Sequence, residues 1–121
     1  MVPKILIIDD ESGVRDMLRG HFEARGFEVL AAADGREGIN FCRTCPPEVI
    51  LLDFKMKSMD GDRALPELRR LAPRSRIFLI SAYPKEIVYE KTKGARIDAY
   101  FEKPVPILEL ERAVCRAFVK P

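Results

Sequence analysis

The chain has no long apolar run, no strong excess of charge of either sign and few cysteines. Its 121 residues are 47% hydrophobic, but the longest purely apolar runs have only the length of a β-strand, which argues against a membrane span. The 21 basic and 19 acidic side chains give a net charge of +2, and no basic stripe with interleaved aromatic residues is present. We therefore expect no direct binding to nucleic acid and no contact with a membrane.

Three cysteines cannot all form disulfides with one another, which favours a reducing cytoplasm as the location of the protein. A strand is expected from the fourth residue onward, so we expect no signal peptide before it. Cys42 and Cys45 have the C-x-x-C spacing of redox and zinc sites. They lie at the expected end of a helix, however, whereas a reactive thiol pair lies at a helix start. Only Cys115 and His21 remain as further zinc ligands, and both fall on other expected helices. We therefore expect neither redox nor zinc chemistry at this pair, and we expect His21 to be a partly buried interface residue.

Strand-like and helix-like patterns alternate five times along the chain, without repeats, low-complexity segments or long linkers. This alternation predicts an α/β fold with a parallel sheet, in a single domain covering residues 1–121. The expected strands lie near residues 4–9, 28–32, 49–53, 77–81 and 98–101, and Pro104 is expected to open the last helix.

Acidic residues close two of the apolar strands. Asp9 and Asp10 follow the run Ile5–Ile8, and Asp53 follows the run Val49–Leu52. In an open parallel sheet, ligands bind beyond the carboxyl ends of the strands, so we expect the three carboxylates to meet there. Carboxylates held that close resist joint ionisation, so the cluster either takes up a proton or binds a cation.

Two further polar side chains end neighbouring strands. Ser81 follows the fourth expected strand, and Lys103 follows the fifth. A lysine and a divalent cation can neutralise an incoming phosphoryl group, and Mg²⁺ prefers carboxylate, carbonyl and water ligands. The set is therefore sufficient for phosphoryl transfer to Asp53. Each residue also has an ordinary explanation as a helix-terminal acid, a cap or a surface lysine, but these explanations do not account for one shared edge.

Four stretches of the sequence together resemble the receiver domain of two-component response regulators, relatives of the chemotaxis regulator. The resemblance covers nearly the whole chain, and it implies a flavodoxin-like (βα)5 doubly wound sandwich with a five-stranded parallel sheet in the order 2-1-3-4-5. The stretches are Ile7-Ile8-Asp9-Asp10-Glu11; Leu51-Leu52-Asp53 with Met56 and Met59-Asp60-Gly61; Leu79-Ile80-Ser81-Ala82; and Tyr100-Phe101-Glu102-Lys103-Pro104.

The resemblance also implies the chemical role of each site residue. Asp53 would accept a phosphoryl group from the phosphohistidine of a sensor histidine kinase or a histidine phosphotransfer protein, and Lys103 would neutralise its charge. Asp10 would bind Mg²⁺, or Mn²⁺, directly, and Asp9 would hold a metal-bound water. Asp53 itself and the backbone carbonyl of Lys55 would complete the protein ligands.

Ser81 and Tyr100 would form the switch. The hydroxyl of Ser81 would close onto the phosphoryl group, and Tyr100 would turn inward, which would change the surface of the fourth helix, fifth strand and fifth helix. That surface would control an output domain or a partner protein, and phosphorylation could also lead to a homodimer. The protein would then be a phosphoacceptor that assists its own modification, not an enzyme.

The chain departs from the family pattern at three places. Lys57 replaces a usual proline, which leaves the stiffness of its loop open, and Gly94-Ala95 comes two residues early, so the fourth helix could end early. Lys55 and Tyr83 are bulky neighbours of the path that a hydrolytic water would take. We expect them to shield the acyl phosphate and prolong its lifetime.

Three other functions compete with this one, and the third of them fits the sequence best. A phosphatase of the haloacid dehalogenase type would want a second aspartate two residues after its nucleophile, where this chain has Lys55. A flavodoxin-like flavin carrier would offer hydroxyls and amides to a phosphate, whereas Asp9-Asp10-Glu11 would repel one. A receiver-like scaffold that works by protein contact without phosphorylation is compatible with all of the residues above.

Overall fold

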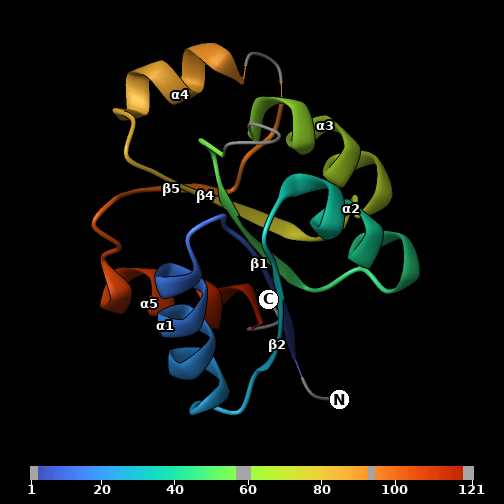
Figure 1. The fold of residues 1–121 in the computed structure, drawn as a ribbon, viewed down its shortest axis with the longest axis vertical. Helices are drawn as coiled ribbons and strands as arrows, with labels where there is room; N and C mark the ends of the chain where they lie inside the picture. The colour runs from blue at the N-terminus through green and yellow to red at the C-terminus, as the bar shows by residue number, and fades with distance from the viewer. Residues whose placement is uncertain (1–2, 57–60, 93–94, 119–121) are drawn as a thin grey trace.

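Five parallel strands form one sheet at the centre of this computed structural model, which describes residues 3–56, 61–92 and 95–118 (Figure 1). The strands lie in the order β2-β1-β3-β4-β5, as predicted. Their bounds are β1 (Lys4–Ile8), β2 (Glu28–Ala32), β3 (Val49–Asp53), β4 (Arg76–Ser81) and β5 (Ala99–Glu102).

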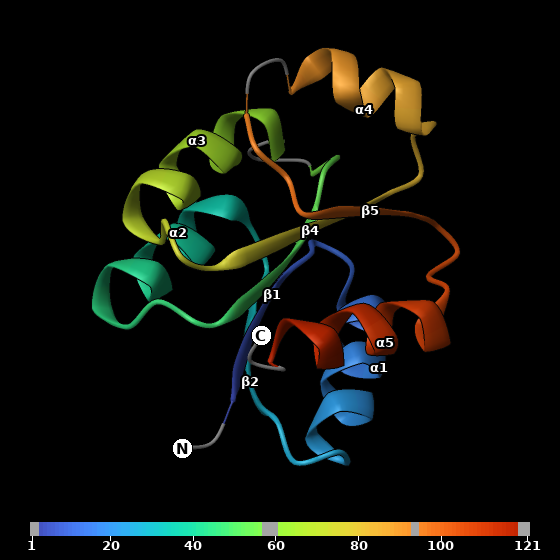
Figure 2. The same ribbon diagram turned by 180° about the vertical axis from the view of Figure 1, so that it is seen from behind.

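Helices cover both faces of the sheet, which gives the predicted flavodoxin-like, doubly wound arrangement (Figures 1 and 2). Apart from polar residues at their ends, the central strands β1, β3 and β4 are apolar, as expected for strands that are buried on both faces. In the described part of the chain, no helix is long and apolar enough to cross a membrane. One face carries α1 (Ser12–Glu23) and α5 (Ile107–Ala117), and the other carries α2 (Gly35–Thr44), α3 (Gly61–Leu71) and α4 (Lys85–Lys91).

Two glycines let helices lie unusually close to the strands that carry the acidic residues. A Cβ atom on Gly38 of α2 would lie 2.3 Å from Cδ1 of Ile8, the last residue of β1. A Cβ atom on Gly61 would lie 2.9 Å from Cα of Phe54, and the Gly61 N–H donates a hydrogen bond to the Phe54 carbonyl. Helix α2 therefore packs directly on the Ile8 side chain before Asp9, and the start of α3 packs on the Phe54 backbone after Asp53.

The last helix begins later than predicted. We expected Pro104 to open it, but α5 starts at Ile107 with Pro106 as its N-cap. Val105 precedes Pro106, and a residue before proline is sterically disfavoured in the helical conformation. This preference agrees with a helix that begins after the second proline.

Lys57 and Gly94, where the sequence departs from the family pattern, lie outside the described residues. Met59 and Asp60 also lie outside them. Helix α4 has seven residues and ends at Lys91. The effects expected from Lys57 and Gly94 remain predictions.

Candidate functional site

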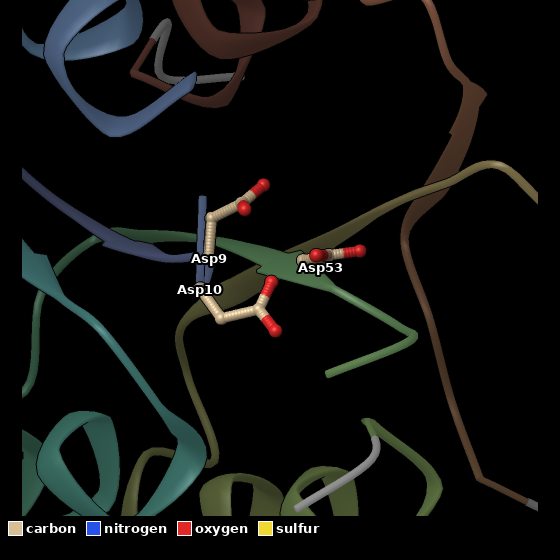
Figure 3. A group of neighbouring side chains, drawn as sticks. All are labelled: Asp9, Asp10 and Asp53. Atoms are coloured by element: carbon tan, nitrogen blue, oxygen red, sulfur yellow. The ribbon is translucent and has the colours of Figure 1, made fainter. Parts of the chain in front are cut away.

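The polar residues predicted from the sequence gather at the carboxyl edge of the sheet. Asp9 and Asp10 follow β1, Asp53 ends β3, Ser81 ends β4 and Lys103 follows β5. Figure 3 shows the carboxyl groups of Asp9 and Asp10 projecting from the end of β1 on the side of Asp53. The parallel topology brings these strand ends together because β1, β3, β4 and β5 are consecutive in the sheet.

The three aspartates form a compact and largely buried cluster. One carboxylate oxygen of each lies within 4.8 Å of the corresponding oxygens of the other two. Asp9 is 2% exposed and Asp53 is 3% exposed, while Asp10 is half-buried. Burial, followed by the negative charge of Asp9, raises the pKa of Asp53 from its ordinary 3.8 to about 7, although Lys103 offsets part of this rise.

Hydrogen bonds to its neighbours hold Asp9 in place. Its Oδ1 accepts a hydrogen bond of 2.8 Å from the backbone N–H of Glu11. Its carbonyl oxygen accepts a bond of 2.7 Å from Nη1 of Arg15, on the first turns of α1. The carboxylate is thereby oriented by the start of the helix that follows it.

Lys103 connects the cluster to a fourth carboxylate. Its Nζ lies 3.0 Å from Oε1 of Glu11, 3.2 Å from Oδ2 of Asp9 and 3.4 Å from Oδ2 of Asp53. Burial alone would lower the pKa of Lys103, but the hydrogen bond to Glu11 and the charges of Asp53 and Asp9 raise it overall. The lysine therefore stays protonated and neutralises part of the acidic cluster.

Glu11 was not assigned to the site from the sequence. It is exposed, unlike the buried aspartates, yet it makes the shortest of the three contacts with Lys103. The available signal was the run of three consecutive acids, which does not say which of them faces a lysine 92 residues away.

The donor set fits a divalent cation. Three carboxylates with oxygens this close can share one ion, and Mg²⁺ usually takes one or two carboxylates and completes its octahedron with carbonyl oxygens and water. A hollow of about 300 Å³ lies beside the cluster, lined by Asp10, Glu11, Lys55 and Met56. This hollow leaves room at the acids for water or a small reactant.

Ser81 and Tyr100 are joined through the backbone of Tyr83. The buried hydroxyl oxygen of Ser81 accepts a hydrogen bond of 3.0 Å from the Tyr83 N–H. The half-buried Tyr100 donates its hydroxyl hydrogen to the Tyr83 carbonyl oxygen. The ring of Tyr100 also meets that of Tyr89, on α4, edge to face at 6.5 Å between centroids. One residue of the β4–α4 loop therefore contacts both expected switch residues.

Lys55 and Tyr83 also touch each other. The Lys55 Nζ lies 5.3 Å from the centroid of the Tyr83 ring, within the range of a cation–π contact. The Phe54 ring approaches the same tyrosine at 6.2 Å. The two bulky residues singled out in the sequence thus form one contact between the β3–α3 and β4–α4 loops.

The cysteine pair lies apart from the strand-end acids, at the end of α2. Cys42 is buried in the core, and burial raises the pKa of its thiol to about 11. Cys45 is exposed and accepts a hydrogen bond of 3.1 Å from Lys4 Nζ. His21 is partly buried between α1 and α5, where Nε2 lies 2.5 Å from Oε1 of Glu111. These positions agree with those predicted for Cys42, Cys45 and His21.

Comparison with known proteins identifies the family: the chain belongs to the response regulator receiver domains, whose family profile matches residues 5–115. It is 38% identical to the regulatory protein AtoC of Escherichia coli, over 96% of this chain and 25% of that protein. It is 31% identical to sporulation initiation phosphotransferase F of Bacillus subtilis, over 94% of this chain and 92% of that protein. The chain therefore spans a quarter of one relative and nearly all of the other.

A solved structure also matches the fold. The CheX–CheY–BeF3–Mg²⁺ complex from Borrelia burgdorferi aligns with a TM-score of 0.82 and 28% identity, covering 98% of this chain and 90% of that chain. The receiver resemblance inferred from the four sequence stretches is thereby confirmed.

Proposed function

We propose that this protein is a phosphorylation-dependent signalling switch in which Asp53 accepts the phosphoryl group. The observation that carries the proposal is the position of Lys103 Nζ, which contacts both Asp53 and Asp9 inside a cluster of three carboxylates. A positive charge held there can neutralise phosphoryl oxygens as they arrive at Asp53. Membership of the receiver family supports the same reading.

Each residue has a proposed part in the transfer. A carboxylate oxygen of Asp53 attacks the phosphorus of a phosphohistidine on a sensor kinase or phosphotransfer protein, and the phosphorus–nitrogen bond breaks with its electrons going to the imidazole. Asp10, Asp53 and the backbone carbonyl of Lys55 would bind Mg²⁺, and Asp9 would hold one of its waters. When bound, the cation supplies charge neutralisation and aligns the phosphoryl oxygens. Lys103 keeps its proton throughout.

We also propose that Ser81 and Tyr100 transmit this event. The Ser81 hydroxyl would donate its hydrogen to a phosphoryl oxygen and move toward Asp53, and Tyr83 would follow because its N–H is bonded to Ser81. Tyr100 would then rearrange with the Tyr83 carbonyl, which changes the surface of α4, β5 and α5. An output domain, a partner protein or a second copy of the chain would recognise the new surface.

In this proposal, residues 1–121 form one receiver domain. The domain works in the cytoplasm as a phosphoacceptor and does not turn over a substrate as an enzyme does.

A second candidate is a receiver-like scaffold that is not phosphorylated in use. It is favoured by the pKa of Asp53, which at about 7 leaves the nucleophile partly protonated when no cation is bound.

One experiment separates the switch from the scaffold. The protein is mixed with Mg²⁺ and acetyl phosphate or phosphoramidate and then weighed intact. The switch predicts a mass increase of about 80 Da that Asp53→Asn abolishes. The control variant Asp16→Asn, on exposed α1, should retain the increase. A wild-type protein that gains no mass, or an Asp53→Asn variant that gains it equally, would overturn the proposal.

A further inference from the structure

A cationic hollow lies between α2 and α3, outside the site described above. These helices lie next to each other on one face of the sheet (Figures 1 and 2). The hollow, which we call the α2/α3 groove, has a volume of about 470 Å³. It is lined by Arg36, Ile39, Asn40, Arg43, Glu67 and Arg70.

The charge of the groove is strongly biased. Its lining holds three guanidinium groups and one carboxylate, an excess as large as the net charge of +2 on the whole chain. Each guanidinium carries five N–H donors in a planar fork that matches a carboxylate. The groove therefore concentrates, in one place, groups suited to binding acidic side chains.

Contacts within the protein leave most of these donors unused. Nη2 of Arg70 pairs with Oε2 of Glu67 at 2.7 Å, and Nη1 of Arg43 donates to the Asn40 side-chain oxygen at 2.9 Å. Arg36 makes no ion pair or side-chain hydrogen bond with the described residues. All three arginines are exposed, so their remaining donors are available to a partner.

The spacing of the arginines suits a helical partner. Arg36 and Arg43 are seven residues apart on α2, which places them about 10 Å apart along one side of the groove. Two glutamates seven residues apart on a partner helix have the same separation and share a face. Ile39 lies between the arginines in the chain and lines the groove, but its side chain is 6% exposed and packs mainly in the core.

The lining favours a protein over a nucleic acid. Glu67 would repel a continuous phosphate backbone, whereas a peptide can place a lysine or a neutral residue opposite it. The groove has no aromatic side chain on which a base could stack.

We propose that the α2/α3 groove binds an acidic helical segment of a protein partner, with glutamate carboxylates paired to Arg36 and Arg43. This docking surface does not depend on Asp53 or on its phosphorylation.

The test uses an alanine-rich helical peptide with glutamates at positions i, i+4 and i+7, added to ¹⁵N-labelled protein at low salt. Resonance shifts should concentrate on α2 and α3. The double variant Arg36→Gln/Arg43→Gln should bind the peptide about five- to tenfold more weakly, as expected for the loss of two exposed charge pairs. Replacing the peptide glutamates with glutamine should have a similar effect.

A charge-matched control is available in Lys91→Gln/Arg112→Gln, which removes the same charge from exposed positions of α4 and α5. In a repeat titration at about 0.15 M salt, it should bind the peptide within about twofold of wild type, since charges more than about 8 Å apart are then largely screened. Three results would overturn the proposal: shifts that concentrate elsewhere, an equal loss of affinity in the control, or tighter binding of a single-stranded oligothymidylate than of the peptide. Thermal unfolding of both variants should match wild type, because all four positions are exposed.

Discussion

The raised pKa of Asp53 leads to a prediction about stability that can be tested without a phosphoryl donor. Burial and the charge of Asp9 raise the pKa of Asp53 to about 7, so ionising it costs free energy in the folded protein. Asp53→Asn replaces the carboxylate with a neutral group of the same shape. Lys103 keeps Glu11 and Asp9 as partners in this variant, so the substitution leaves no buried charge unpaired.

The sign of the pH dependence follows from proton binding. Between pH 4 and pH 7 the folded protein holds the Asp53 proton more tightly than the unfolded chain does, so the contribution of Asp53 to stability falls as pH rises through this range. Each pKa unit corresponds to about 1.4 kcal/mol, and a rise from 3.8 to about 7 therefore sets an upper limit of roughly 4 kcal/mol at pH 8. Because water and side chains relax around buried charges, we expect Asp53→Asn to be about 2–3 kcal/mol more stable than wild type at pH 8, and nearly equal to it at pH 4.

Urea unfolding in EDTA at several pH values would measure this difference. Added Mg²⁺ should narrow the gap at pH 8, because a bound cation favours the ionised carboxylate. Asp16→Asn serves as the control and should follow the wild-type pH profile. A stability difference between Asp53→Asn and wild type that is the same at pH 4 and pH 8 would refute the electrostatic account of the cluster.

Two further predictions concern the loops and the packing around the site. Replacing Lys55 and Tyr83 together with alanine should raise the dephosphorylation rate of the phosphorylated protein at least about threefold, because we expect these two contacting side chains to shield the acyl phosphate from water. An unchanged rate would contradict this shielding role. Gly38→Ala should lower the free energy of unfolding in urea by about 1–3 kcal/mol, because its Cβ would overlap Ile8, whereas Gly13→Ala, with open space around it, should not destabilise the protein.

The strand-end positions of the acids, Ser81 and Lys103 could be predicted because alternating elements force a parallel sheet, and parallel strands end at a common edge. The start of α5 was predicted wrongly at Pro104. The sequence contained the signal that corrects it, since Val105 stands directly before a second proline and is therefore disfavoured in a helix.

The contacts among these residues could not be predicted in the same way. Glu11 and Lys103 meet only because β1 and β5 lie on either side of β3 and β4 and end at the same edge, and nothing in a run of acids identifies the one that faces the lysine. The partner of the Tyr100 hydroxyl is a backbone carbonyl, a group that every residue carries. Pattern analysis can therefore identify the tyrosine but not the atom that it binds.

That backbone partner bears on how a signal would leave the site. Ser81 binds the N–H of Tyr83, and Tyr100 binds the carbonyl of the same residue. These two groups belong to adjacent peptide planes joined at one Cα, so a displacement of one plane moves or rotates the other. Coupling between Asp53 and β5 would then depend on the backbone of residue 83 rather than on its side chain. The tyrosine ring contacts Lys55 and Phe54, so the proposed control of phosphoryl lifetime and the proposed transmission of the switch would use different parts of one residue.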